Sequence, residues 1–111
     1  MNEMQLPSLE FGGLVHRGNQ VLGTVMLRTG NIEAAKGHLL ASAATPTGAG
    51  LESFGPSMGL ASELLNTGES ETVVQYLTQC KTLWSVEGER TIESWIVAIR
   101  QGQKPDFGPN L

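Results

Sequence analysis

Hydrophobic side chains recur along the chain every three to four residues, which is the period of an α-helix with one buried side. This pattern predicts five helical segments, at roughly 15–29, 32–44, 55–67, 70–84 and 89–101. Each segment is amphipathic and too short to be stable alone in water. The connections between the segments are mostly short, which favours antiparallel neighbours. We therefore expect one all-α domain of about five helices.

Proline and glycine residues bound these segments. They predict an irregular N-terminal stretch over 1–14, a loop around 45–53 and a tail over 102–111. Pro56 suits the first turn of the third segment. The other residues on which these breaks depend are Pro7, Gly12, Gly13, Pro46, Gly48, Gly50, Gly102 and Pro105.

The first segment has two distinct faces. We assign the side toward the core to Val15, Leu22, Val25 and Met26. The opposite side carries a polar stripe at positions i, i+3, i+7 and i+11, namely Arg17, Gln20, Thr24 and Arg28. Gly30 then suits the left-handed residue that ends a helix, and Asn31 is a good N-cap for the next.

Two parts of the chain share one spacing of large, small and turn residues, at a constant offset of 38 residues. The two copies are Leu22-Gly23-x-x-Met26-x-x-x-Gly30-x-x-x-x-Ala35-x-x-x-Leu39 and Leu60-Ala61-x-x-Leu64-x-x-x-Gly68-x-x-x-x-Val73-x-x-x-Leu77. We interpret the small residue as the point where the partner helix approaches closely, and the glycine as the tight turn between two helices. One such hairpin cannot bury both of its faces, so the two hairpins should stack.

This spacing resembles the pattern of the tetratricopeptide repeat family. The resemblance implies repeat one at about 16–46, repeat two at about 54–84, a capping helix at about 89–101 and a right-handed stacked array. The chain departs from the family where a leading Trp is expected, because Asn19 and Ser57 occupy those places. The ending Pro105-Asp106-Phe107-Gly108 is also similar to the ends of small bacterial helical-repeat proteins of uncharacterised function.

A second internal similarity joins Phe54-Gly55-Pro56-Ser57-Met58 to Phe107-Gly108-Pro109-Asn110-Leu111. Two interpretations stay open: the tail is the start of a lost third repeat, or the match arises by chance.

The amino-acid composition argues against several classes of function. With 7 Lys and Arg against 11 Asp and Glu, the net charge is −4, which disfavours binding to nucleic acid. No apolar run is long enough to cross a membrane, and the first residues lack the pattern of a signal peptide, so we expect a cytoplasmic protein. A single Cys excludes an intrachain disulfide framework.

The residues that could carry chemistry are better explained by packing. Cys80 lies on an apolar helix face, and His38 borders one, as expected for a packed thiol and a boundary histidine. Trp84 and Trp95 lie at core spacing, and the acidic residues near Glu69 are typical of a helix start. Neither a metal-ligand spacing nor a phosphate loop is present. We therefore expect no enzymatic activity, cofactor or metal.

A surface remains as the candidate site. The resemblance places the first helix of each hairpin on a concave side, which would present Arg17, Gln20, Thr24, Arg28, Ser62 and Asn66. We expect a protein-interaction module that holds a peptide or partner segment there, with the arginines pairing acidic groups. An ordinary solvated face is the alternative for the stripe. For the function, the alternatives are a self-assembling homodimer, along the first or fifth helix, and a small-molecule binder.

Overall fold

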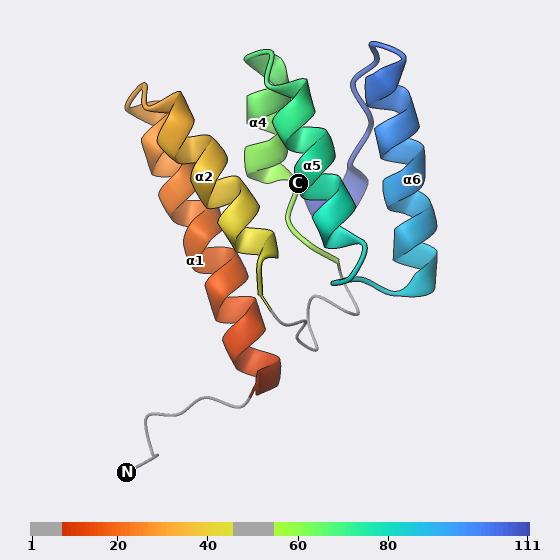
Figure 1. The fold of residues 1–111 in the computed structure, drawn as a ribbon, viewed down its shortest axis with the longest axis horizontal. Coiled ribbons are helices and arrows are strands. Elements are labelled where there is room, and N and C mark those ends of the chain that lie inside the picture. Colours follow the sequence, from red (N-terminus) through yellow and green to blue (C-terminus); the bar gives the residue numbers. More distant parts are fainter. Residues whose placement is uncertain (1–7, 46–54) are drawn as a thin grey trace.

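The computed structural model describes residues 8–45 and 55–111, with side chains from residue 13 onward. Within these residues the chain forms five α-helices and one short 3-10 turn, with no β-strand, which confirms the all-α prediction (Figure 1). The elements are α1 (Ser8–Arg28), α2 (Ile32–Ala43), α4 (Gly59–Asn66), α5 (Ser70–Cys80), α6 (Val86–Arg100) and η1 (Gly108–Asn110).

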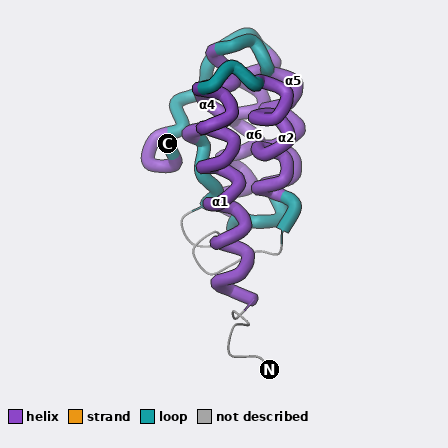
Figure 2. The backbone as a smooth tube through the Cα atoms, turned by 90° about the vertical axis from the view of Figure 1, so that its left-hand side faces the viewer, coloured by secondary structure: helices purple, strands orange, loops and turns teal. Residues whose placement is uncertain are grey.

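The helices form two antiparallel hairpins followed by a single helix. α1 pairs with α2, α4 pairs with α5, and α6 packs beside α5 (Figure 1). Seen from the side, α1 and α4 lie toward one face of the molecule and α2 and α5 toward the other (Figure 2). The core lies between these layers, and its largest fully buried side chains include Leu39, Met58, Leu64, Tyr76 and Leu77.

Glycine in the left-handed conformation ends three of the helices. Gly30, Gly68 and Gly102 have φ values of 88°, 89° and 78°. Each is followed by a residue whose N–H bonds back to the helix, as in Asn31 N–H to Met26 O at 2.8 Å. Asn31 also caps α2, because its side chain accepts the N–H of Ala34. The turn positions predicted at Gly30 and Gly68 are therefore confirmed.

Gly23 lies at the closest approach of α1 to its neighbours. A Cβ atom at this position would overlap the side chain of Leu60 on α4 and lie 3.1 Å from the Cβ of His38 on α2. Ala61, 38 residues further along the chain, is fully buried. The predicted role of Gly23 as a point of close helix approach is therefore confirmed.

Several predicted boundaries are wrong. α1 begins at Ser8 rather than near 15, and Gly12-Gly13 lies inside it, because glycine weakens a helix without ending it. α4 begins at Gly59, since Pro56 is buried in the non-helical segment before it. Residues 1–7 and the loop that contains Pro46, Gly48 and Gly50 lie outside the described residues.

The boundaries around the last two helices also differ from the prediction. α5 ends at Cys80, where residues 81–84 form turns. α6 begins at Val86, because the Ser85 side chain accepts the N–H of Gly88 and caps the helix. The cap starts α6 three residues before the predicted position.

The C-terminal segment, residues 101–111, folds back onto the residues that precede α4. Phe107 is buried, and its ring contacts Trp95 edge to face at a centroid distance of 5.0 Å. The N–H of Met58 donates to Asn110 O at 2.6 Å, and Asn110 Nδ2 donates to Pro56 O at 3.1 Å. The described residues of the two similar Gly-Pro stretches therefore contact each other.

Candidate functional site

The face of α1 that enters the core is not the one expected from hydropathy. His16, Gln20 and Gly23 are buried, whereas Leu22 and Val25 are about half exposed. The helix is rotated so that two polar side chains reach buried partners on other elements. The predicted inward face is therefore wrong for Leu22 and Val25, and Gln20 is not part of an exposed stripe.

Gln20 belongs to a buried polar network that joins both hairpins. Its Nε2 donates to Ser42 Oγ at 3.0 Å and to the Tyr76 hydroxyl oxygen at 3.1 Å. The Tyr76 hydroxyl donates in turn to Ser57 O at 2.7 Å. Burial raises the pKa of Tyr76 well above its usual range, so it stays neutral. The network fixes α1 against α2, α5 and the segment before α4.

His16 extends this network to the backbone. Its Nε2 accepts the N–H of Ser57 at 2.9 Å, so the proton of the neutral ring must lie on Nδ1. Nδ1 donates to Ser42 O at 3.0 Å. Burial lowers the pKa of His16 below 6.5, which favours the neutral ring. Both ring nitrogens are therefore engaged in holding the fold, and neither is available as a general base.

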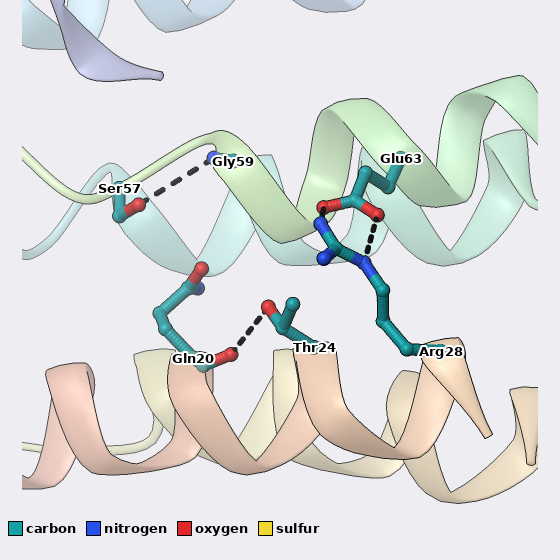
Figure 3. Close-up of polar contacts among 6 residues, drawn as sticks. All are labelled: Gln20, Thr24, Arg28, Ser57, Gly59 and Glu63. Atoms are coloured by element: carbon teal, nitrogen blue, oxygen red, sulfur yellow. Dashed lines mark hydrogen bonds and ion pairs between the residues drawn. The ribbon is translucent and has the colours of Figure 1, made fainter.

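A groove of about 330 Å³ runs between α1 and α4, the first helices of the two hairpins. Thr24 projects into it from α1 and faces the start of α4 (Figure 3). The wall includes apolar side chains from both helices and from the C-terminal segment, namely Val21, Val25, Leu60 and Leu111. Gln20, Ser57, Gly59 and Glu63 complete the lining.

An ion pair crosses the groove near the end of α1. Arg28 Nη2 lies 3.2 Å from Glu63 Oε2, and Arg28 Nε donates to Glu63 Oε1 at 3.4 Å (Figure 3). The pair is exposed, so it stabilises the fold only weakly. Its consequence is that the Arg28 charge is already matched from within the chain.

The structure brings together only some of the six predicted site residues. Gln20 and Thr24 line the groove, and Arg28 bridges it. Arg17, Ser62 and Asn66 do not line it, and Asn66 instead accepts a hydrogen bond from Lys104 Nζ at 3.0 Å. The exposed valines Val21 and Val25 are lining residues that the sequence pattern did not identify as a surface.

A second cavity of about 270 Å³ lies where the α4–α5 turn meets the end of α6. Its lining includes Leu65, Ile99 and the hydrogen-bonded pair Asn66 and Lys104. Lys104 is the one titratable side chain among the lining residues, so this cavity has few groups that could take part in catalysis.

The side chains with reactive groups, Cys80 and His38, are packed against other parts of the protein. Cys80 is fully buried, and burial raises its pKa to about 12, so its thiol is inert at neutral pH. His38 is half-buried, and its Nδ1 donates to Asn19 Oδ1 at 2.9 Å. Both observations agree with the packed thiol and boundary histidine predicted above.

The acidic residues near the helix starts have basic partners. Glu69 Oε1 lies 3.0 Å from Lys36 Nζ, and Glu71 Oε2 lies 2.8 Å from Arg100 Nη1. Across residues 8–45 and 55–111, His, Cys, Asp and Glu side chains form no group of three that could hold a metal ion. No helix among these same residues combines the length and hydrophobicity needed to cross a bilayer.

Comparison of the chain with protein-family models, with curated proteins and with solved structures gave no match.

Proposed function

We propose that the chain is a non-enzymatic protein-interaction module that holds an apolar segment of a partner protein in the groove between α1 and α4. The observation that carries the proposal is the groove itself, with half-exposed valines along one wall and Leu60 in the other. Exposed apolar residues that gather at a concave surface are typical of interaction sites.

The chemistry of the groove favours an apolar segment over an acidic one. The Arg28 charge is matched by Glu63, and the Gln20 amide is used inside the protein. Two arginines were expected to bind carboxylates of a partner. Among the described ion pairs, Arg17 has no carboxylate partner within the chain, but it does not line the groove. A partner that places small aliphatic side chains against Val21 and Val25 fits this surface better.

The volume argues for a peptide rather than an enclosed ligand. About 330 Å³ is near the lower end of the range for small-molecule sites, and the groove is open to solvent. It has room for a few side chains of a segment whose backbone stays outside. The resemblance to tetratricopeptide repeats supports the same placement, because the first helices of stacked hairpins form the concave side. A cytoplasmic setting fits a chain whose one cysteine is a buried free thiol.

A random-peptide library selected on the purified protein tests this proposal. The decisive variant is Thr24→Trp, which adds a ring inside the groove from a half-buried position outside the core cluster. The matched control is Val97→Trp, which adds the same ring at an exposed apolar position on α6. We expect the selected peptides to be apolar, to bind Thr24→Trp at least about tenfold more weakly, and to bind the control unchanged.

Two outcomes would contradict the proposal. One is a set of selected peptides that bind Thr24→Trp and the parent equally well. The other is a set of acidic peptides whose binding falls with Arg17→Ala, which would return the site to the polar stripe.

A further inference from the structure

A second feature of α1 extends beyond the groove, and the groove explains it only in part. The helix carries an outward row of apolar and small residues at positions i, i+4, i+7 and i+11, namely Leu14, Gly18, Val21 and Val25. The three side chains with apolar atoms are exposed by 45%, 63% and 47%. At 100° per residue the four positions fall within about 60° of one another, on the side opposite the buried Gly23. α1 is therefore apolar on a half-exposed face that extends from the groove wall at Val21 and Val25 to Leu14 and Gly18 outside the groove.

From this row we infer that α1 is a self-association face, on which two copies of the chain pack their first helices antiparallel around a two-fold axis. In a two-fold contact the same patch must be complementary to its own reversed copy. The row meets this condition when the axis lies between positions 18 and 21. Gly18 of one copy then faces Val21 of the other, and Leu14 faces Val25.

The sizes of the side chains support this register. Gly18 has open space around its Cβ position, so it forms a shallow gap in the middle of the row. A valine from the second copy can enter that gap, which lets the helix axes approach to about 8 Å, the close end of the range for packed helices. Leu22, which is 49% exposed, lies at the same edge of the contact in both copies and would be covered as well.

The charges beside the row are compatible with the contact. Arg28 is paired with Glu63 of its own chain, so it brings no unmatched charge to the interface. Arg17 lies at the edge opposite Leu22, where it stays in water. The two Arg17 side chains share that edge, and salt screens their repulsion. Self-association should therefore strengthen, not weaken, as salt is added.

A row of this size supports a weak dimer. Four half-exposed positions per chain fall short of the roughly 800 Å² per partner of a stable complex. We therefore expect a reversible dimer that forms in the high-micromolar range and is visible by sedimentation equilibrium. Because Gly18 does not line the groove, its variants separate this inference from the proposed peptide binding.

The test uses the full chain and three variants. Gly18→Glu places a carboxylate in the open gap, so the monomer should fold as before while dimer formation falls at least about tenfold. Val97→Glu makes the same kind of change at an exposed site on α6 and should leave the dimer unchanged. Val21→Lys should also abolish self-association. A mixture of Gly18→Glu with Val21→Lys should associate more strongly than either alone, because positions 18 and 21 face each other.

Each result bears on the inference. Loss of the dimer in Gly18→Glu with rescue in the mixture supports both the face and its register. A parent chain that stays monomeric up to near-millimolar concentration overturns the inference. So does a dimer that survives Gly18→Glu but is lost in Val97→Glu, which would place self-association on α6.

Discussion

The hydrogen bonds of His16 make the stability of the fold depend on pH in a defined direction. The neutral ring donates from Nδ1 to Ser42 O and accepts from the Ser57 N–H at Nε2. A second proton on Nε2 would place two N–H groups against each other, which destroys the bond to Ser57. Burial and the nearby Arg17 charge oppose that proton, and the pKa of His16 is accordingly lowered below 6.5.

The sign and size of the effect follow from the difference in proton uptake between the two states. Between the lowered pKa and 6.5, the unfolded chain binds a proton that the folded chain excludes. Stability from this group is therefore complete above about pH 6.5 and is lost as the pH falls, at a limiting slope of about 1.4 kcal/mol per pH unit. Because the total free energy of unfolding of a protein is about 5–15 kcal/mol, a loss of this size is easily measured.

Urea unfolding followed by circular dichroism at several pH values between about 5 and 7.5 measures this slope. His16→Gln cannot titrate, so it should flatten the slope in that window. It should also lower stability at pH 7.5 by about 1–3 kcal/mol, because a buried group at Ser42 or Ser57 loses its partner. The matched control His38→Gln removes a half-buried histidine and should lower the stability at pH 7.5 by less than His16→Gln does. Equal slopes for His16→Gln and the parent would refute the lowered pKa of His16.

Two further predictions concern tight packing. A Cβ at Gly88 would overlap the indole of Trp84, so Gly88→Ala should lower the unfolding free energy by about 1–3 kcal/mol. A Cβ at Gly37 would meet open space, so Gly37→Ala should raise the unfolding free energy by about 0.5–1 kcal/mol. Thermal melts of the pair check this, and a stabilised Gly88→Ala would contradict the described contact. Phe107→Ala should cost about 3–5 kcal/mol in urea unfolding, because the ring is buried against Trp95; an unchanged midpoint would mean that the C-terminal segment does not hold the core.

The sequence predicts those parts of the fold that depend on local chemistry. The helical period identified every described α-helix, and the left-handed turns at Gly30 and Gly68 followed from the position of glycine after each apolar run. The close approach at Gly23 followed from residue size. The turns depend on contacts within one hairpin, and the close approach depends only on the size of Gly23 where it meets α2 and Leu60 of α4.

The candidate site depends on partners that are far apart in the sequence, which is why its prediction was partial. Hydropathy places Leu22 inside and Gln20 outside, but Gln20 finds a partner in Tyr76, 56 residues away. His16 likewise bonds to Ser57 across 41 residues. No local pattern reports such pairs, and they rotate α1 so that its valines border the groove beside Gln20 and Thr24. The burial of Phe107 was missed for the same reason.

The non-helical segment over 55–58 has a consequence for how the molecule loses its structure. α1 is bonded to it through His16, and the C-terminal segment is bonded to it through Asn110. In a simple linear array each hairpin contacts only its neighbours, so the two ends can fray independently. Here one short stretch of backbone is hydrogen-bonded both to α1 and to the C-terminal segment. Loosening either end therefore weakens the attachment of the other, and the chain should unfold in a single cooperative step rather than hairpin by hairpin.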